Sequence, residues 1–365
     1  MSRKKIFLKG FFNKNLGDDL FVKILVERYK NVQFEMYSKL NYKKVYNLDN
    51  LKIYTNKSFI VILRRIINLF FKIFKINKVV QIENLKKYDG IIMIGGSLFI
   101  EYDGIDYNKY IANQFNFKVP FFIIGANFGP YETEEYLEFH KNNIFNNALD
   151  ICFRDKYSYN LFKNIKNVRY APDIVFGLDT RNIEQKEENT VIISVIDCDK
   201  DTGKIADKDM YNKKISEFID YFYKKQYNVI LMSFSEDQGD ESVIQDILKI
   251  NDNKNKAKTF YYRGNINEAL QIIAKAKIII GNRFHANILG LIFNKTIIPI
   301  AYSDKTINTL KDIKFEGKIF DIRKIDEFSA NQLNEFDLNY KINVENEKVE
   351  SEKHFEKIDK FLMEE

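Results

Sequence analysis

Cysteine, histidine and tryptophan are scarce in this chain of 365 residues, which has two cysteines, three histidines and no tryptophan. The two cysteines, Cys152 and Cys198, lie far apart and lack the spacing of a zinc site. They therefore argue against a disulfide scaffold and fit a reducing compartment. Three dispersed histidines do not suit a multi-histidine metal centre, so we expect no metal ion.

Long apolar runs and a strong charge are missing as well. No stretch approaches the roughly 20 apolar residues of a membrane-spanning helix, and the first twelve residues lack the apolar core of a secretory signal. The net charge of +6 is small for this length. It permits contact with phosphates or an acidic membrane surface, but it does not indicate a nucleic-acid partner. We expect a cytoplasmic protein, with peripheral attachment to the inner face of the membrane as the alternative.

A regular alternation of strand-like and helix-like segments runs along most of the chain. A polar stretch, 177–190, interrupts it and marks a domain boundary. Such alternation predicts parallel sheets covered by helices. The expected fold class is α/β, with two Rossmann-like domains facing a cleft, as in the GT-B glycosyltransferase architecture. The predicted parts are an N-terminal domain at 1–180, a C-terminal domain at 188–335, and an extension with a closing helix at 336–365.

The segment 59–78 is apolar but carries basic residues throughout. One interpretation is a basic amphipathic helix in a membrane interface, giving a peripheral contact. The other is an ordinary helix packed on the sheet, with its basic side chains reaching water. We prefer the packed helix, because apolar helices in α/β proteins usually belong to the core.

The most informative run is 277–290, KIIIGNRFHANILG. It predicts a buried strand, a tight turn at Gly281 and a helix that opens with Arg283 and His285. A helix N-terminus favours anions, an arginine fork fits a carboxylate or phosphate, and a histidine can carry a proton near neutral pH. The run therefore predicts a pocket for a small anion beside an acid–base group. The alternative is that Arg283 pairs with a structural carboxylate and His285 is a core histidine.

Other polar turns follow predicted strands. Each is weak alone, because Asp and Asn at a helix start also serve as caps. The residues are Asn15, Gly17, Asp18 and Asp19; Gly95, Gly96 and Ser97; Gly125, Asn127, Gly129 and Pro130; Arg154, Asp155 and Ser158; Pro172 and Asp173; and Ser235, Glu236 and Asp237.

As an ordered set, these turns resemble the polysaccharide pyruvyl transferase family from about residue 6 to residue 312. The matching elements are N-x-G-D-[DE] at 15–19, a glycine-rich turn at 95–97, a turn like G-x-G-x-G-P at 125–130, R-D-x-x-S at 154–158, and G-x-R-x-H from Gly281 to His285 followed by Pro299, Tyr302 and Lys305. The chain departs from the family at Ser97, at Ala126 and Asn127, and at Phe284. The first three departures concern the expected acceptor side.

The resemblance implies transfer of a pyruvyl group from phosphoenolpyruvate to saccharide hydroxyls, usually as a ketal, with no further cofactor. In that chemistry Arg283, Arg154 and the amides at the start of the helix 284–293 bind the donor, and Lys305 binds one more oxygen. His285 is the expected general acid. Asp18, Asp155 and Asp173 stay open as the base. Further residues expected to contact substrate are Asn15, Gly17, Gly95, Gly96, Ser97, Asn127, Asp155 and Tyr302.

Two other functions remain open at this point. One is a GT-B-like glycosyltransferase with a nucleotide-sugar donor, and the other is a non-catalytic saccharide-binding protein. The expected partners are phosphoenolpyruvate and a saccharide acceptor, which is either polymeric, oligomeric or lipid-linked. The sequence does not indicate an oligomeric state.

Overall fold

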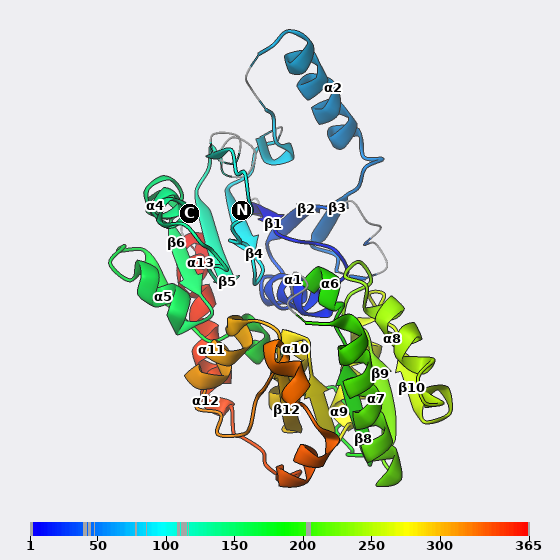
Figure 1. The fold of residues 1–365 in the computed structure, drawn as a ribbon. Coiled ribbons are helices and arrows are strands. Elements are labelled where there is room, and N and C mark those ends of the chain that lie inside the picture. Colours follow the sequence, from blue (N-terminus) through cyan, green and yellow to red (C-terminus); the bar gives the residue numbers. More distant parts are fainter. Residues whose placement is uncertain are drawn as a thin grey trace. The chain divides into compact units, whose positions relative to one another are not determined.

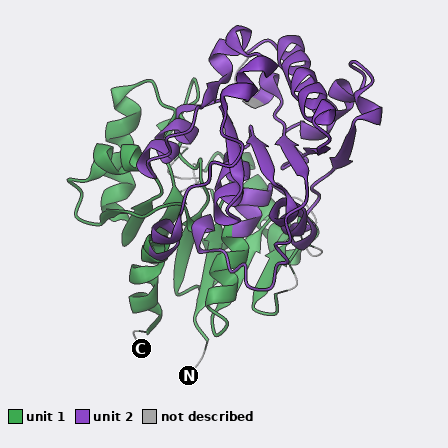
Figure 2. Ribbon diagram, turned by 90° about the horizontal axis from the view of Figure 1, so that it is seen from below, with its two compact units in different colours: residues 1–12, 21–174, 350–365 green, residues 13–20, 175–349 purple. Residues whose placement is uncertain are grey.

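The structure is a computed structural model. It describes residues 3–38, 42, 45, 46, 48–76, 79–84, 86–107, 110, 115, 117–201 and 206–363. The chain divides into two compact units (Figure 2). Unit 1 comprises residues 1–12, 21–174 and 350–365, and unit 2 comprises residues 13–20 and 175–349. Residues 13–20 thus belong with the second half of the chain, and the last residues belong with the first.

Unit 1 contains a seven-stranded sheet with the order β3-β2-β1-β4-β5-β6-β7. All of its strands are parallel (Figure 1). Buried apolar side chains fill the middle strands, as expected for a sheet covered on both faces. The strands are β1 Lys5–Lys9, β2 Gln33–Tyr37, β3 Leu51–Tyr54, β4 Gly90–Ile94, β5 Phe121–Ala126, β6 Asp150–Phe153 and β7 Val168–Tyr170.

Helices connect these strands, and a C-terminal pair completes the unit. Lys353 accepts a hydrogen bond on its carbonyl from Arg169, and Asp359 accepts one from Tyr29, so the end of the chain is tied to unit 1. The helices are α1 Leu16–Arg28 and α12 Glu345–Ser351, which both begin in unit 2, and α2 Phe59–Ile73, α4 Glu134–Asn143, α5 Lys156–Phe162 and α13 Glu356–Met363, with 3₁₀ turns that include η1 Ile82–Asn84 and η7 Glu352–Phe355.

Unit 2 contains a six-stranded parallel sheet with the order β10-β9-β8-β11-β12-β13. Its strands are β8 Thr190–Ser194, β9 Asn228–Met232, β10 Ala257–Phe260, β11 Ile278–Gly281, β12 Thr296–Ala301 and β13 Phe320–Asp321. Its helices are α6 Cys198–Asp201, α7 Lys208–Lys224, α8 Asp240–Leu248, α9 Ile266–Lys275, α10 Phe284–Ile292 and α11 Asp304–Asp312.

Both sheets have the doubly wound order in which the chain returns to the first strand and continues on its other side. In such sheets the crevice between the first strand and its new neighbour binds ligands at the carboxyl ends of the strands. The pairs that flank this switch point are β1 and β4 in unit 1, and β8 and β11 in unit 2. The two predicted Rossmann-like domains are confirmed, and the cleft between them stays a prediction.

Helix α2 packs on the core of unit 1 only at its N-terminal end, so the preferred interpretation of segment 59–78 as a packed helix is wrong for most of its length. Val61 is its one buried residue. Six large apolar side chains from Phe59 to Phe74 are 51–80% exposed. The helical periodicity of the segment predicted an apolar face correctly, but it could not indicate what that face contacts. Residues 77 and 78 of the segment lie outside the described residues.

Within the described part of the chain, the helices are all too short or too polar to cross a membrane.

Candidate functional site

The predicted anion site lies at the switch point of unit 2. Strand β11 ends at Gly281, and Arg283 is the N-cap residue of α10. Ser194, the last residue of β8, holds this turn: its hydroxyl accepts hydrogen bonds from the backbone N–H of Asn282 at 2.8 Å and of Arg283 at 3.1 Å. The Asn282 side chain donates to the Ser194 carbonyl at 2.6 Å. These bonds place Arg283 between the carboxyl ends of the two strands.

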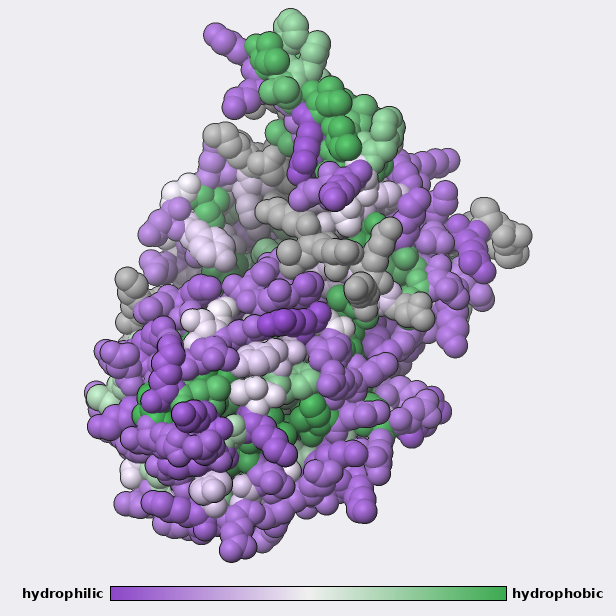
Figure 3. All heavy atoms as spheres, turned by 90° about the vertical axis from the view of Figure 1, so that its right-hand side faces the viewer, coloured by the Kyte–Doolittle hydropathy of each residue, from purple (hydrophilic) through white to green (hydrophobic). Residues whose placement is uncertain are grey.

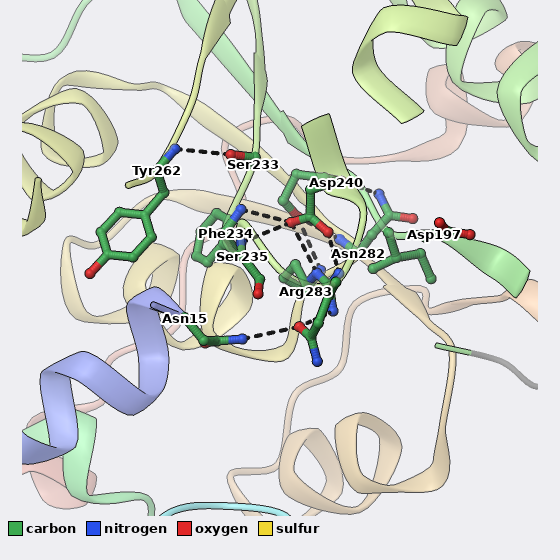
Figure 4. A network of polar contacts seen from close by, with 12 residues as sticks. Asn15, Asp197, Ser233, Phe234, Ser235, Asp240, Tyr262, Asn282 and Arg283 are labelled. Carbon is green, nitrogen blue, oxygen red and sulfur yellow. Dashed lines mark hydrogen bonds and ion pairs between the residues drawn. The ribbon is translucent and has the colours of Figure 1, made fainter. Parts of the chain in front are cut away.

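The Arg283 guanidinium is paired with a carboxylate inside unit 2 (Figure 4). Its Nη2 donates to Asp240 Oδ1, and its Nε donates to Asp240 Oδ2 at 3.3 Å. Its Nη1 donates to Gln238 Oε1 at 2.9 Å. Asp240 is fully buried, and Arg283 is 4% exposed. The alternative pairing with a structural carboxylate is therefore present, and a donor-binding role for Arg283 stays a prediction.

Asp240 is itself fixed by backbone amides. Its Oδ2 accepts hydrogen bonds from the N–H groups of Phe234 at 2.8 Å and Ser235 at 3.1 Å, both in the turn after β9. Asp240 also opens α8, so the helix N-terminus adds favourable electrostatics for a negative side chain. A carboxylate with several hydrogen bonds to its charged form holds the guanidinium in a single orientation.

The N-terminal turn joins the same network, although more than 260 residues separate it in sequence from Arg283. Asn15 pairs with Ser235 in an isolated β-bridge, and its side chain donates to Gln238 Oε1 at 3.2 Å. The Asn15 Oδ1 accepts a hydrogen bond from the Gly17 N–H at 3.0 Å. Asn15 and Arg283 thus share Gln238 as a hydrogen-bond acceptor (Figure 4).

His285 packs directly on Gly17. A Cβ atom added to Gly17 would lie 1.8 Å from His285 Nδ1 and 2.4 Å from two ring carbons. Glycine at this position is therefore required for close approach of the imidazole, not for backbone freedom. His285 is 9% exposed and makes an edge contact with the ring of Phe284, at 4.9 Å between ring centroids.

The two acidic residues of the N-terminal turn differ in their surroundings. Asp19 is fully buried, and its Oδ2 accepts a hydrogen bond from the Tyr262 hydroxyl. Asp18 is half-buried in the first turn of α1. The burial of Asp19 indicates a structural role, whereas Asp18 stays a predicted base.

The start of α10 has two features of an anion site. No acidic residue lies in its first turn, and the N-cap residue Arg283 makes no side-chain capping hydrogen bond to the helix. Backbone N–H groups and a partial positive charge are therefore directed toward the turn that holds Arg283 and His285.

A second group of predicted residues gathers in unit 1, at the carboxyl ends of β4, β5 and β6. Arg154 donates to Asp173 Oδ2 at 2.9 Å and to Asn127 Oδ1 at 2.7 Å, and all three side chains are buried. Ser97 donates to the same Asn127 oxygen at 3.4 Å. A Cβ atom on Gly96 would lie 2.6 Å from the Arg154 guanidinium, so glycine at this position leaves the space that the arginine side chain occupies. Gly95 precedes it with a positive φ of 148°.

Asp155 and Ser158 have a structural part in this group. Asp155 is the N-cap residue of α5, and its carboxylate accepts from the Ser158 N–H at 2.7 Å and the Ser158 hydroxyl at 3.1 Å. Ser158 in turn accepts a hydrogen bond from the Phe128 N–H at 2.7 Å. These bonds fix the third glycine-bearing turn to the R-D-x-x-S element.

Tyr302 directly follows strand β12, and Lys305 lies in the first turn of α11. Lys305 Nζ is 4.8 Å from the centroid of the Tyr302 ring, a cation–π contact. A role for Lys305 in binding donor oxygens stays a prediction.

The structure therefore brings together Asn15, Gly17, Arg283 and His285 in unit 2, and separately Gly96, Ser97, Asn127, Arg154 and Asp173 in unit 1. Sequence reasoning missed the residues that link the first group, namely Ser194, Gln238, Asp240 and Asn282. The nearest signal was the acidic turn after β9, which we noted only as far as Asp237. Among the described residues, no three His, Cys, Asp or Glu side chains cluster as a metal site requires, and the expected absence of a metal stays a prediction.

Comparison with known proteins identifies the family. A family model described as "Polysaccharide pyruvyl transferase" matches residues 15–304. The amylovoran biosynthesis protein AmsJ of Erwinia amylovora is 22% identical over 267 residues, which cover 67% of this chain and 64% of that protein. The chain thus matches somewhat less than two thirds of the length of this relative.

Two solved structures have a similar fold at low sequence identity. The UDP-GlcNAc 2-epimerase of Methanocaldococcus jannaschii has a TM-score of 0.56 at 10% identity, over 98% of this chain and 99% of that one. Anabaena HepE, solved with UDP and glucose, has a TM-score of 0.52 at 10% identity, over 98% of this chain and 96% of that one. At such identities the likeness concerns the fold alone.

Proposed function

The chain belongs to the polysaccharide pyruvyl transferase family, and we propose that it transfers a pyruvyl group from phosphoenolpyruvate to saccharide hydroxyls. The observation that carries the proposal is the contact between the two most specific motifs. The N-x-G-D-D turn and the G-x-R-x-H turn meet where the His285 ring lies on Gly17. The similarity to a protein named for amylovoran biosynthesis supports a role in making a surface polysaccharide.

In the proposed reaction, His285 protonates the methylene carbon of phosphoenolpyruvate. The carbon that carries the phosphate then becomes an oxocarbenium-like centre, and a first sugar hydroxyl adds to it and loses its proton. The second hydroxyl adds as phosphate leaves and gives up its proton, which closes the ketal. A positioned general acid typically contributes about 10²–10⁴-fold to the rate. No cofactor or metal enters these steps.

Donor binding is assigned to Arg283, the start of α10 and Lys305. Asp240 orients the guanidinium, so that Arg283 offers a fixed edge to a phosphate or carboxylate. A donor-binding role for Arg154 stays a prediction, and within unit 1 its guanidinium pairs with Asp173. Among the candidate bases our choice is Asp18, because it lies in the first turn of α1 directly after Gly17, the residue that the His285 ring contacts.

The acceptor is a saccharide, and a lipid-linked intermediate is one form of it. We place the reaction in the cytoplasm, because Cys152 and Cys198 are buried and form no disulfide.

The test is release of phosphate from phosphoenolpyruvate across saccharide acceptors. The variant is His285→Asn, and the matched control is His140→Asn, which changes a buried histidine of unit 1 that has no assigned role. We expect kcat of the first variant to fall by about 10²–10⁴-fold, while the control keeps its turnover per folded molecule. Full transfer by His285→Asn would refute the acid role.

A nucleotide-sugar glycosyltransferase is the second candidate, because both similar structures are named for UDP-sugar enzymes or UDP complexes. Thermal shift distinguishes the two. A donor at 100 times its Kd stabilises the fold by about 2.7 kcal/mol, so phosphoenolpyruvate should raise the melting temperature and a panel of UDP-sugars should not. A shift with UDP-sugars alone would favour the glycosyltransferase, and a shift with saccharides but neither donor would favour a binding protein.

A further inference from the structure

Helix α2 presents an apolar face to solvent. The exposed side chains recur every three or four residues, so they form one stripe along the helix. Phe70 and Phe74 also contact each other within it, with ring centroids 4.3 Å apart. The stripe comprises Phe59, Ile62, Leu63, Ile66, Leu69, Phe70 and Ile73, and Phe74 extends it. Figure 3 shows hydrophobic side chains gathered on the projection at the top of the view, where α2 lies.

The opposite side of the same helix faces the rest of unit 1, where Val61 and the partly buried Ile60 contact the core and polar side chains make further contacts. The Asn68 side chain donates to the Val80 carbonyl at 3.0 Å and accepts from the Val80 N–H at 2.8 Å. Arg65 donates to Asn56 Oδ1 at 2.8 Å. Arg64 lies over the ring of Tyr37 and lines a cavity of about 340 Å³ at the ends of β1 and β2. These contacts therefore hold the helix with its exposed apolar stripe directed outward.

The charge of the segment has one sign. Between Asp49 and Glu83 the sequence contains no acidic residue, and its basic residues are Lys52, Lys57, Arg64, Arg65, Lys72, Lys75 and Lys78. Lys72 and Lys75 are exposed at the end of α2. An apolar stripe flanked by cations matches the interface of a bilayer with anionic headgroups, where acyl chains accept the stripe and phosphates accept the cations.

We propose that α2 lies in the surface of a membrane rich in anionic lipid and holds the protein there. A second copy of the chain is a poorer occupant, because a symmetric contact through α2 would place like charges opposite one another. The other large apolar side chains that the structure shows exposed, such as Leu149 and Val349, are scattered over other elements. This inference goes beyond the proposed reaction and does not depend on it.

The test is flotation of the full chain with phosphatidylcholine vesicles, with and without phosphatidylglycerol. We expect the wild type to float with the anionic vesicles at about 0.1 M salt and to be released at about 1 M, where the Debye length falls to about 3 Å. Ile66→Ser with Phe70→Ser should lower the partition coefficient by about 100-fold or more. Lys72→Glu with Lys75→Glu should lower it by about 30-fold or more.

Matched controls carry the same changes elsewhere. Leu149→Ser with Val349→Ser removes two exposed apolar residues, and Lys213→Glu with Lys224→Glu reverses two exposed lysines. Both controls should bind as the wild type does, with all melting temperatures within a few degrees of one another. Three results would each overturn the proposal. The first is equal binding to vesicles with and without phosphatidylglycerol, and the second is unchanged binding by both α2 variants. The third is a dimer that the α2 variants dissociate, without any lipid binding.

Discussion

Replacement of Gly17 by alanine tests the contact on which the candidate site depends. Gly17 is the second residue of α1, and its φ is not positive. In an exposed helix, glycine to alanine would stabilise the fold by about 0.5–1 kcal/mol, because glycine loses more backbone entropy on folding. Here the new Cβ would lie 1.8 Å from His285 Nδ1.

The size of the effect follows from this distance. Non-bonded atoms of this kind prefer a separation of about 3.5–4 Å, so the imidazole has to move by more than about 1 Å. Overpacking of this kind typically costs about 1–3 kcal/mol. After subtraction of the helix gain, we expect a net loss of up to about 2.5 kcal/mol in unfolding free energy. A misplacement of about 1 Å in a catalytic group can lower turnover by about 100-fold.

The assay combines urea denaturation with phosphate release from phosphoenolpyruvate at saturating acceptor. Gly90→Ala is the control, because its Cβ would lie 3.2 Å from the Phe361 ring, a contact that a small ring movement relieves. That variant should keep its kcat. If Gly17→Ala unfolds and turns over as the wild type does, the packing of His285 on Gly17 is refuted. If it is destabilised but keeps full kcat, His285 is not the acid.

Two more predictions concern buried charge. Asp240→Asn leaves the buried Arg283 guanidinium without its carboxylate, so the unfolding free energy in urea should fall by about 3–5 kcal/mol; an unchanged midpoint would contradict the pairing. Burial lowers the pKa of His354 to about 4 from 6.5. The folded state therefore keeps it neutral while the unfolded chain binds a proton, and stability should fall by up to about 3 kcal/mol between pH 6.5 and pH 4. Burial also lowers the pKa of His140 to about 4, so His354→Gln should remove part of this slope and leave the contribution of His140; a slope equal to that of the wild type would exclude His354 as a cause.

The sequence predicted the middle strands of both sheets, because parallel strands buried on both faces appear as continuous apolar runs. It did not predict β3 and β13. Strand β3, Leu51–Tyr54, is an edge strand with one buried side chain in four, and β13 has two residues. Short edge strands show neither a continuous apolar run nor an alternation of apolar and polar residues, so their pairing is decided by the neighbouring strand.

The part of the site that is formed by residues close together in the sequence was predictable. Arg283 and His285 begin a helix after a strand, as the run of apolar residues and Gly281 indicated. The carboxylate that pairs with Arg283 was not predictable, because Asp240 at the start of α8 has the pattern of an ordinary helix cap. Its role depends on a contact across 43 residues of sequence, which no local pattern encodes.

The pairing of both predicted arginines changes how the donor charge has to be balanced. Arg283 is compensated by Asp240, and Arg154 by Asp173. A buried guanidinium without a counter-ion would cost several kcal/mol, so these pairs explain how the arginines stay charged and oriented before a ligand arrives. They also remove most of the net attraction for a trianion. Among the described residues Lys305 forms no ion pair with a carboxylate and contacts the Tyr302 ring instead. In the proposed function, the net positive charge that attracts phosphoenolpyruvate to unit 2 therefore comes from Lys305 and the N-terminus of α10. Arg283 then orients the bound donor through its fixed guanidinium.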